Sequence, residues 1–336
     1  MRSSALLTAV ASVFASAVLA SGADWSVYRG NAARTAYTAD TLEDGISLQW
    51  VFKTRHAPQP AWPRSDRMAF DRAFQPIVVD GKVIFGSSVD GKVTALDITN
   101  GKTVWTFATE GPVRFAPAAW KDQLFVASDD GFLYALSSTT GELRWKHRGG
   151  PNAAAILGNE RMISKWPARG GPVVVDDMVY FAAGIWPSDG IFLYALDAKS
   201  GSVVWRNDDS GAIYMPQPHG GASAESGVSA QGYLVVSGDK LFVPTGRAVP
   251  AAFDRKTGKF LYFHLQKFGH NGGTQTMAIG DTFYNDGIGF NATSGAKVAS
   301  LGGGQLAATD DGFATANAGV VSTMKWVEVE KPDRKG

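Results

Sequence analysis

The sequence predicts an all-β protein, a β-propeller built from four-stranded antiparallel blades. Runs such as VIFGSS and FLYAL alternate with period two between Asp-Gly and Thr-Gly turns, which excludes a helical solenoid. The shortest separations between successive turn glycines, Gly101 to Gly141 and Gly258 to Gly295, lie near the ~40-residue period of propeller blades. An eleven-residue unit recurs as ALDITNGKTVW (95–105), ALSSTTGELRW (135–145) and ALDAKSGSVVW (195–205).

Longer units of four short strands follow one another around this repeat. Close copies occupy residues 76–107, 117–147 and 172–207, and weaker copies occupy 233–265, 277–301 and 306–329. The weaker copies carry Tyr262 and Ala299 in place of the tryptophan, and the last copy lacks a clear final strand. ISLQWVFKT (46–54) resembles a fourth strand that has no first three before it. Pairing it with the last copy would close a ring of about six blades and leave no open edge. The alternative is that the chain forms part of a ring of seven or eight blades.

Each position that recurs in the copies of the eleven-residue unit has an expected structural role in its hairpin. Ala95 leaves room for an indole beside the third strand, Asp97 hydrogen-bonds to the turn backbone, and Gly101 supplies the positive φ of a tight turn. Trp105 lies on the outer strand, where its large apolar area wedges against the neighbouring blade. The same roles are expected for Ala135, Gly141, Trp145, Ala195, Asp197, Gly201 and Trp205.

Composition and charge narrow the partners and the compartment. The 336 residues include 32 Lys plus Arg and 31 Asp plus Glu, so no net field recruits nucleic acid. Residues 1–23 have the pattern of a cleaved secretory signal peptide, 24–329 are expected to form the propeller, and 330–336 a charged tail or truncation point. Because cysteine is absent, disulfides and a lipid anchor are excluded. No later segment is long enough to span a membrane. We expect a soluble exported protein, periplasmic or extracellular.

The unit Ala-Leu-Asp-x-x-x-Gly-x-x-x-Trp resembles the tryptophan-docking motif of the pyrroloquinoline quinone (PQQ) repeat family. That family includes the propellers of quinoprotein dehydrogenases and of the outer-membrane assembly lipoprotein, so the resemblance implies the blade type without implying bound quinone. For the alcohol dehydrogenase branch it implies PQQ, Ca²⁺ held by a Glu, Asn and Asp set, and a vicinal disulfide over the quinone. This chain has no cysteine, and no motif onto which the calcium ligands carry over.

Loop lengths nominate one face of the propeller for binding. In blades with strands A to D, the A–B and C–D turns lie on one face, and the B–C turns and D–A links lie on the other. The turns of the first face are all tight, whereas the long segments, 55–76, 147–172, 183–190 and 207–232, all belong to the second. We call this second face the long-loop face and expect it to bind a protein, peptide or glycan.

Four residues of the long loops are candidates for cofactor binding, should PQQ bind: Trp62, Arg72, Trp166 and Arg169. Indoles stack on a flat conjugated ligand, and guanidinium groups fork onto carboxylates. The alternative is a structural role. Trp62 and Trp166 precede prolines, a setting that favours packing, and Arg169 at a strand entry suits an ion pair.

Three further residues are candidates for acid–base chemistry: Asp71, His219 and Glu225. His219 and Glu225 lie six residues apart in a Gly- and Ser-rich loop, so the sequence imposes no geometry on them. No two histidines share a metal-ligand spacing, so no metal site is assigned.

Three functions remain open from the residues alone. The first is an exported binding or assembly scaffold that works through the long-loop face without catalysis. The second is a quinoprotein oxidoreductase for alcohols or sugars, with PQQ, Ca²⁺ and a carboxylate base such as Glu225 or Asp71. The third is the N-terminal propeller of a larger secreted enzyme.

Overall fold

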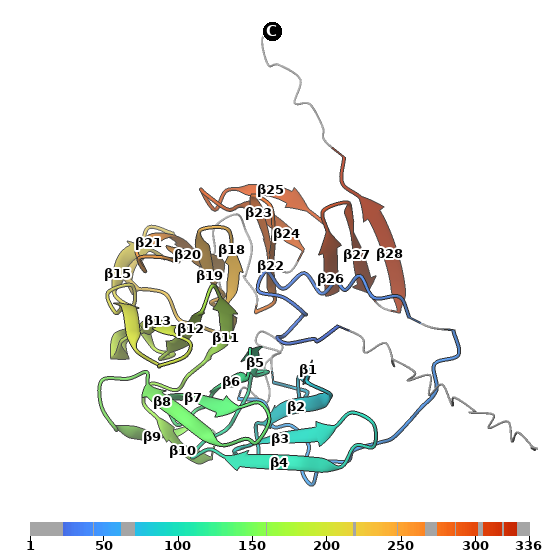
Figure 1. The fold of residues 1–336 in the computed structure, drawn as a ribbon. Helices are drawn as coiled ribbons and strands as arrows, with labels where there is room; N and C mark the ends of the chain where they lie inside the picture. The colour runs from blue at the N-terminus through green and yellow to red at the C-terminus, as the bar shows by residue number, and fades with distance from the viewer. Residues whose placement is uncertain are drawn as a thin grey trace, which may run out of the picture.

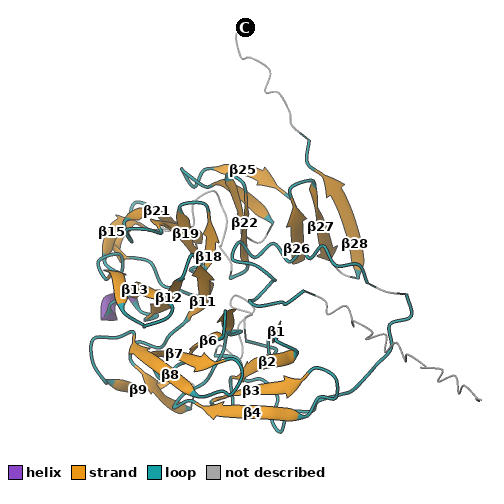
Figure 2. Cartoon of the chain, viewed as in Figure 1, coloured by secondary structure: helices purple, strands orange, loops and turns teal. Residues whose placement is uncertain are grey.

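Six β-sheets follow one another around a central axis like the blades of a propeller (Figure 1). The computed structural model describes residues 23–42, 44–61, 71–158, 160–217, 220–246, 248–265, 274–285, 287–301, 305–317 and 319–327. Within these ranges the helical content is one short 3-10 turn, η1 (Pro187–Asp189), drawn in purple in Figure 2. They contain no helix of the length and apolarity needed to cross a membrane. The predicted all-β propeller is confirmed.

Blades 1 to 3 have antiparallel strands in simple up-and-down order. Blade 1 consists of β1 (Ile77–Val79), β2 (Lys82–Ser87), β3 (Lys92–Asp97) and β4 (Thr103–Ala108). Blade 2 consists of β5 (Ala118–Trp120), β6 (Gln123–Ala127), β7 (Phe132–Ser137) and β8 (Leu143–Arg148). Blade 3 consists of β11 (Gly170–Val175), β12 (Met178–Ala183), β13 (Phe192–Asp197) and β14 (Val203–Asn207), with β17 (Gly232–Tyr233) added parallel to β11.

Blades 4 and 5 repeat this order, and blade 6 has three described strands. Blade 4 consists of β18 (Val235–Ser237), β19 (Lys240–Val243), β20 (Ala248–Asp254) and β21 (Phe260–Leu265). Blade 5 consists of β22 (Thr276–Ile279), β23 (Thr282–Asn285), β24 (Ile288–Asn291) and β25 (Lys297–Ser300). Blade 6 consists of β26 (Gln305–Thr309), β27 (Gly312–Asn317) and β28 (Val320–Lys325).

The hydrophobic core is divided into layers, each between two successive blades. A representative contact joins Phe242 of blade 4 to Phe283 of blade 5, whose ring centroids lie 4.7 Å apart. Central strands are buried on both faces because each sheet is covered by a neighbour on either side. The described residues form such layers from blade 1 through to blade 6, and the ring stays open between blades 6 and 1 (Figure 1).

An aromatic side chain from the outer strand of one blade packs on the glycine turn of the next. Trp105 of β4 lies so close to Gly141 that a Cβ there would sit 2.5 Å from the indole. Its Nε1 also donates a hydrogen bond to the carbonyl of Ser138 at 3.2 Å. Ala95 lies directly opposite Trp105 in the β3–β4 pairing, so a small side chain underlies the indole. The equivalent pairs are Trp145 with Gly201 and Trp205 with Gly258.

The docking contact persists where the sequence repeat weakens. A Cβ on Gly295 would lie 2.8 Å from the ring of Tyr262. The Tyr262 hydroxyl donates a hydrogen bond to the Ala292 carbonyl at 2.8 Å. Trp50, outside any blade, packs on Gly101 of blade 1 and donates to the carbonyl of Ile98 at 2.8 Å. Any aromatic side chain with a polar hydrogen can therefore occupy this position.

One sequence prediction is wrong. Residues 46–54 form no β-strand, although Trp50 occupies the docking position expected of a fourth strand. A strand requires a backbone neighbour, and the outer described strand of blade 6, β28, does not pair with this segment. Residues 46–54 and β28 therefore both keep exposed apolar side chains, among them Leu48 and Val51 on the segment and Val321 on β28.

A segment that the repeat does not include runs through the centre of the propeller. Trp25 exchanges two backbone hydrogen bonds with Val78 of β1, and Ser26 accepts one from Ala119 of β5. Further along, three carbonyls accept backbone hydrogen bonds from the inner strands of blades 4, 5 and 6: Ala32 from Val236, Ala33 from Ala278, and Thr35 from Ala308. We call residues 25–35 the central segment, because it links the inner strands of blades far apart in sequence.

Arg34 anchors the central segment and is fully buried. Its guanidinium donates to the carbonyls of Tyr28, Pro172 and Leu234 at 2.9 to 3.0 Å, so it reaches blade 3 and the entry of blade 4. The guanidinium carbon also lies 5.6 Å from the ring centroid of Tyr233, which stacks on Tyr28. Burial lowers the pKa of Arg34 to about 10, which keeps the side chain charged at neutral pH.

Substitution of Gly141 tests the docking contact. Gly141 has a φ of +75°, and a Cβ there would overlap Trp105. G141A should therefore displace the indole in addition to straining the backbone. Gly238 is the matched control, because its φ is +57° and a Cβ would meet nothing within 4 Å. In urea unfolding, G141A should lose about 2 kcal/mol more than G238A. Equal losses would mean that the indole contact contributes nothing.

Substitution of Arg34 tests the central segment. R34M removes every hydrogen-bond donor of the side chain, so the carbonyls of Tyr28, Pro172 and Leu234 each lose a hydrogen bond. We expect the free energy of unfolding to fall by about 3 kcal/mol. R34K keeps the charge and part of the hydrogen bonding, so its loss should be smaller. An unchanged urea midpoint for R34M would contradict this account of the segment.

Candidate functional site

Two inserted hairpins and η1 cover the long-loop face. The hairpin of β9 (Ala155–Gly158) and β10 (Arg161–Ser164) lies in the link between blades 2 and 3, and that of β15 (Ile213–Pro216) and β16 (Ser223–Ser226) follows blade 3. β9–β10 lies over B–C turns of the first two blades, because Arg161 donates to the Val89 carbonyl and the Ser164 amide to that of Asp129. β16 packs beside η1.

These inserted elements carry exposed apolar side chains. Leu157 and Met162 are 75% and 62% exposed and lie directly opposite one another in the β9–β10 pairing. Tyr214 of β15 and Trp186 beside η1 are 69% and 49% exposed. Large exposed apolar side chains gathered on protruding elements are typical of surfaces that contact other macromolecules.

Of the four candidates for cofactor binding, two are buried and bonded within the protein. Trp166 is 6% exposed, and its Nε1 donates to the Asp189 carbonyl at 2.6 Å. Arg169 is 3% exposed and binds Asp129 through Nε at 2.6 Å and Nη2 at 2.9 Å. Arg72 lies on the exposed surface, and Trp62 lies outside the described residues.

The two described candidates for acid–base chemistry, Glu225 and Asp71, lie in different environments. Glu225 lies exposed on β16, opposite Tyr214 in the hairpin. Asp71 is buried and accepts hydrogen bonds from the Ala61 amide. His219 lies outside the described residues.

A buried network of two arginines and two aspartates joins the links and turns of the long-loop face. Arg114 donates through Nη1 to Asp71 at 2.5 Å and through Nε to Asp129 at 2.6 Å. Asp129 also binds Arg169, so the order is Asp71, Arg114, Asp129, Arg169. All four side chains are at most 3% exposed. Formal charges balance, so the network cross-links loops of blades 1, 2 and 3 with no excess charge to offer a ligand.

The two aspartates of this network differ in the number of guanidinium groups they face. Burial raises the pKa of Asp71, and Arg114, with smaller contributions from Arg169 and the Ala61 amide, only partly offsets that effect. Burial acts on Asp129 as well, but the charges of Arg169 and Arg114 together overcome it and hold the pKa of Asp129 below its usual range. In the sequence Asp129 looks like a simple residue of an Asp-Asp-Gly turn, and nothing there indicates this role. Arg114 was missed altogether, since no repeat or motif marks it.

Trp166 and Arg169 are not free to form a cradle for PQQ. Trp166 belongs to the hydrophobic core between blades 2 and 3, and Arg169 is committed to Asp129 with only its buried Nη1 left unpartnered. In the described part of the chain, no three His, Asp or Glu side chains gather where they could hold Ca²⁺. The geometry therefore matches the structural alternative for Trp166 and Arg169.

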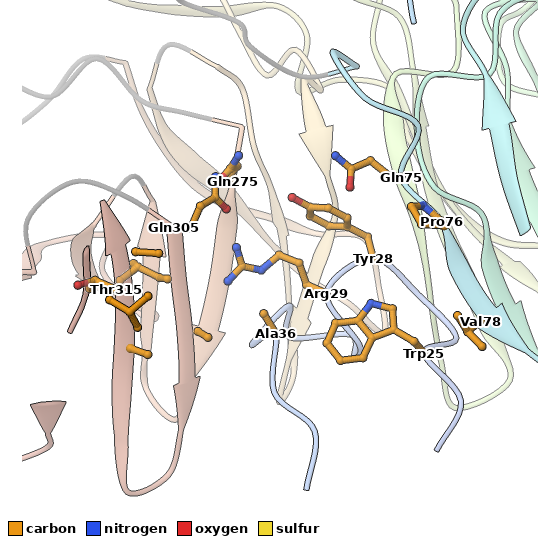
Figure 3. A pocket seen from close by; sticks show the side chains of 15 residues that line it. Trp25, Tyr28, Arg29, Ala36, Gln75, Pro76, Val78, Gln275, Gln305 and Thr315 are labelled. Atoms are coloured by element: carbon orange, nitrogen blue, oxygen red, sulfur yellow. The ribbon is translucent and has the colours of Figure 1, made fainter. Parts of the chain in front are cut away.

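A pocket of about 600 Å³ occupies the open side of the ring between blades 1 and 6 (Figure 3). Tyr28 and Arg29 of the central segment line it together with three glutamines, Gln75, Gln275 and Gln305. Arg29 donates to the carbonyl of Arg34 at 2.8 Å. The described lining includes no carboxylate and no histidine, so it offers no general base.

Comparison with protein families gives one clear match. The family model described as outer membrane protein assembly factor BamB matches residues 47–165 and 161–266, which is more than half of the chain. The match covers blades 1 to 4 and the inserted hairpins.

Curated relatives divide between assembly factors and enzymes. The chain is 30% identical over 174 residues to tetrathionate hydrolase of Acidithiobacillus ferrooxidans, covering 51% of this chain and 30% of that protein. It is 26% identical over 212 residues to BamB of Yersinia pestis, covering 59% and 47%. It is 28% identical over 144 residues to the dehydrogenase subunit of quinone alcohol dehydrogenase of Gluconobacter oxydans, covering 39% and 18%. The chain thus spans less than half the length of these relatives.

Solved structures support the fold. BamB of Moraxella catarrhalis superposes with a TM-score of 0.56 at 22% identity, covering 77% of this chain and 74% of that one. A europium-containing methanol dehydrogenase superposes with a TM-score of 0.57 at 17% identity, covering 84% and 58%. At these identities the likeness extends to the propeller architecture alone.

Replacement of Asp129 tests the buried network. D129N leaves two guanidinium groups without their shared charge, so we expect a loss of about 3 kcal/mol in the free energy of unfolding. Asp129 is ionised at a lower pH in the folded chain than in the unfolded chain, whose aspartates have a pKa of about 3.9. The contribution of ionised Asp129 to the free energy of unfolding is complete above the pKa of the unfolded chain and disappears as the pH falls through the pKa of the folded chain.

The difference in Tm between wild type and D129N should therefore shrink below about pH 4. D189N is the matched control, because Asp189 is also a B–C turn aspartate but pairs with Lys165 at a partly exposed site. Its effect should stay within about 0.5 kcal/mol. A stable D129N variant, or a Tm difference that does not vary with pH, would contradict the role assigned to the network.

Proposed function

The chain belongs to the family of the outer membrane protein assembly factor BamB, and from that premise we propose that it is an exported, non-catalytic scaffold that binds a protein partner through its long-loop face. Export is supported by the signal-peptide pattern of residues 1–23. The name of the Yersinia pestis relative supports a role in the assembly of outer membrane proteins.

The observation that carries this proposal is the apolar pair of Leu157 and Met162. The two side chains lie opposite one another on a hairpin of the long-loop face and are among its most exposed apolar groups. Burying such a pair against a partner contributes about 2 kcal/mol per side chain. Tyr214 and Trp186 extend the apolar surface toward blade 3, and such aromatic side chains are enriched at protein interfaces.

The inserted hairpins also offer backbone hydrogen bonds. β9 and β10 pair only with each other among the described strands, as do β15 and β16. Each hairpin therefore presents strand edges with unpaired backbone groups, to which an extended polypeptide can add as a further strand. A partner that supplies β-strands with alternating apolar side chains fits both features.

The catalytic alternative finds less support in the side chains. The arginine that would clamp a quinone carboxylate, Arg169, serves Asp129 instead. Asp71, which would serve as base, is buried against Arg114. Quinone-dependent relatives share the blades, but in this chain Asp71 and Arg169 act as loop cross-links.

Charge substitution on the β9–β10 hairpin tests the proposal. L157D/M162D should leave the Tm unchanged, because both side chains are exposed. In the organism that carries the gene, a deletion strain complemented with this variant should show at least a several-fold lower amount of folded outer membrane proteins than one complemented with wild type. The matched control is V104D/V298D, two similarly exposed valines on outer strands, 50% and 57% exposed.

Two outcomes would overturn the proposal. One is an equal amount of folded outer membrane proteins in the strains with L157D/M162D and V104D/V298D, which would show that the β9–β10 hairpin has no part in the function. The other is a shifted quinone absorbance when PQQ and Ca²⁺ are added to the purified protein at micromolar concentration, which would favour the oxidoreductase.

A further inference from the structure

A second feature of the long-loop face is a pocket of about 320 Å³ between blades 3 and 4. The B–C insertion of blade 3 contributes Ile185 and Pro187, and the end of β21 contributes Phe263 and Leu265. Trp186 also lines the pocket, and Ser226 at the end of β16 places the β15–β16 hairpin beside it. The walls are thus largely apolar, and the volume falls at the lower end of the range of small-ligand sites, about 300 Å³ and above.

Two residues that line this pocket each carry a buried polar side-chain atom without a hydrogen-bond partner. These atoms are Oε1 of Gln231 and Oγ1 of Thr245, on residues that are 4% and 7% exposed. The backbone brings them close, since the Gln231 amide donates to the Pro244 carbonyl at 2.8 Å. An unpartnered buried polar group destabilises a protein by about 1–3 kcal/mol, so two of them on one pocket call for an explanation.

The chemistry of the lining defines a ligand. The described lining residues carry no formal charge, which disfavours an anionic quinone or a phosphate. A sugar would need a hydrogen-bond partner for each of several hydroxyls, whereas the apolar side chains here outnumber the polar ones. A phenol fits. Its ring would pack against Phe263, Leu265 and Ile185. Its hydroxyl would donate to Gln231 Oε1 and accept from Thr245 Oγ1 once these two side chains turn toward it.

We propose that this pocket binds a tyrosine side chain of the polypeptide partner. The inference rests on the proposed function and adds to it a specificity-determining contact. A strand added to the β15–β16 hairpin runs past the pocket mouth at Ser226, where one of its side chains can enter. Aromatic anchors in a desolvated pocket dominate the affinity of many interfaces.

The first experiment uses small probes on the purified protein. N-acetyl-L-tyrosinamide should bind more tightly than N-acetyl-L-phenylalaninamide by about 5-fold or more, because only the former carries the hydroxyl. Binding is measured by ligand-detected NMR titration. Equal affinities, no binding of either amide, or preferential binding of N-acetylglucosamine would each overturn the proposal.

Variants of the two polar groups supply the second readout. Q231M and T245V remove an unpartnered group at similar volume, so each should raise the Tm of the unliganded protein. Each should also weaken binding of the tyrosine amide about 5-fold and leave the phenylalanine amide unchanged. Q123M is the matched control, because Gln123 Oε1 is likewise buried and unpartnered but does not line the pocket. It should raise the Tm without any effect on binding.

The outcomes separate this proposal from the function it refines. A lower Tm of Q231M and T245V with unchanged tyrosine binding overturns the pocket assignment, while the L157D/M162D defect would stand. Conversely, tyrosine binding with wild-type behaviour of L157D/M162D would keep the pocket and overturn the assembly role of the hairpin.

Discussion

The contact on which the rest of the structure depends is the seating of an outer-strand aromatic on the glycine turn of the following blade. Trp105, Trp145 and Trp205 each fill the space that a side chain at the glycine would need, and each donates a hydrogen bond to a turn carbonyl. Apart from the short parallel pairing of β17 with β11, the described blades share no strand pairing with their neighbours. The angle between successive blades is therefore set by such side-chain contacts and by the apolar layers beneath them.

This constraint also decides where function can lie. Because the docking turns must stay short to hold an indole, insertions accumulate on the opposite face, where blades tolerate them. That face receives two hairpins, η1 and a buried Asp71–Arg114–Asp129–Arg169 network that fixes the loops from below. This rigid base supports the exposed side chains of Leu157 and Met162 and the pocket lined by Gln231. Its rigidity would reduce the conformational entropy lost when a partner binds.

The blade type and the face that carries the long loops were predictable from the sequence because both follow from a repeat. The docking motif recurs in register, and loop lengths need only be compared between its copies. The charge network was not predictable, since Arg114, Asp129 and Arg169 belong to three different loops and their pairing depends on the ring. Asp129 resembles a turn residue in sequence and is one, yet it also faces two guanidinium groups. Residues 46–54 were predicted as a strand from their resemblance to the fourth strand of the repeat, but a strand needs a neighbour that the described part of blade 6 does not supply. Unpartnered atoms such as Gln231 Oε1 leave no trace in a sequence.

The central segment has a consequence for the order of folding. It precedes every blade in the chain, yet Ser26 bonds to blade 2, Ala33 to blade 5 and Thr35 to blade 6. During synthesis this segment emerges before all six blades, so it waits longest for its partners in blades 5 and 6. Each blade closes through local hairpins, which form fast, whereas the hub closes through contacts of very large sequence separation, which form slowly. We therefore expect the blades to form before the axis is filled, so that the inner-strand edges are the last backbone groups to find their partners.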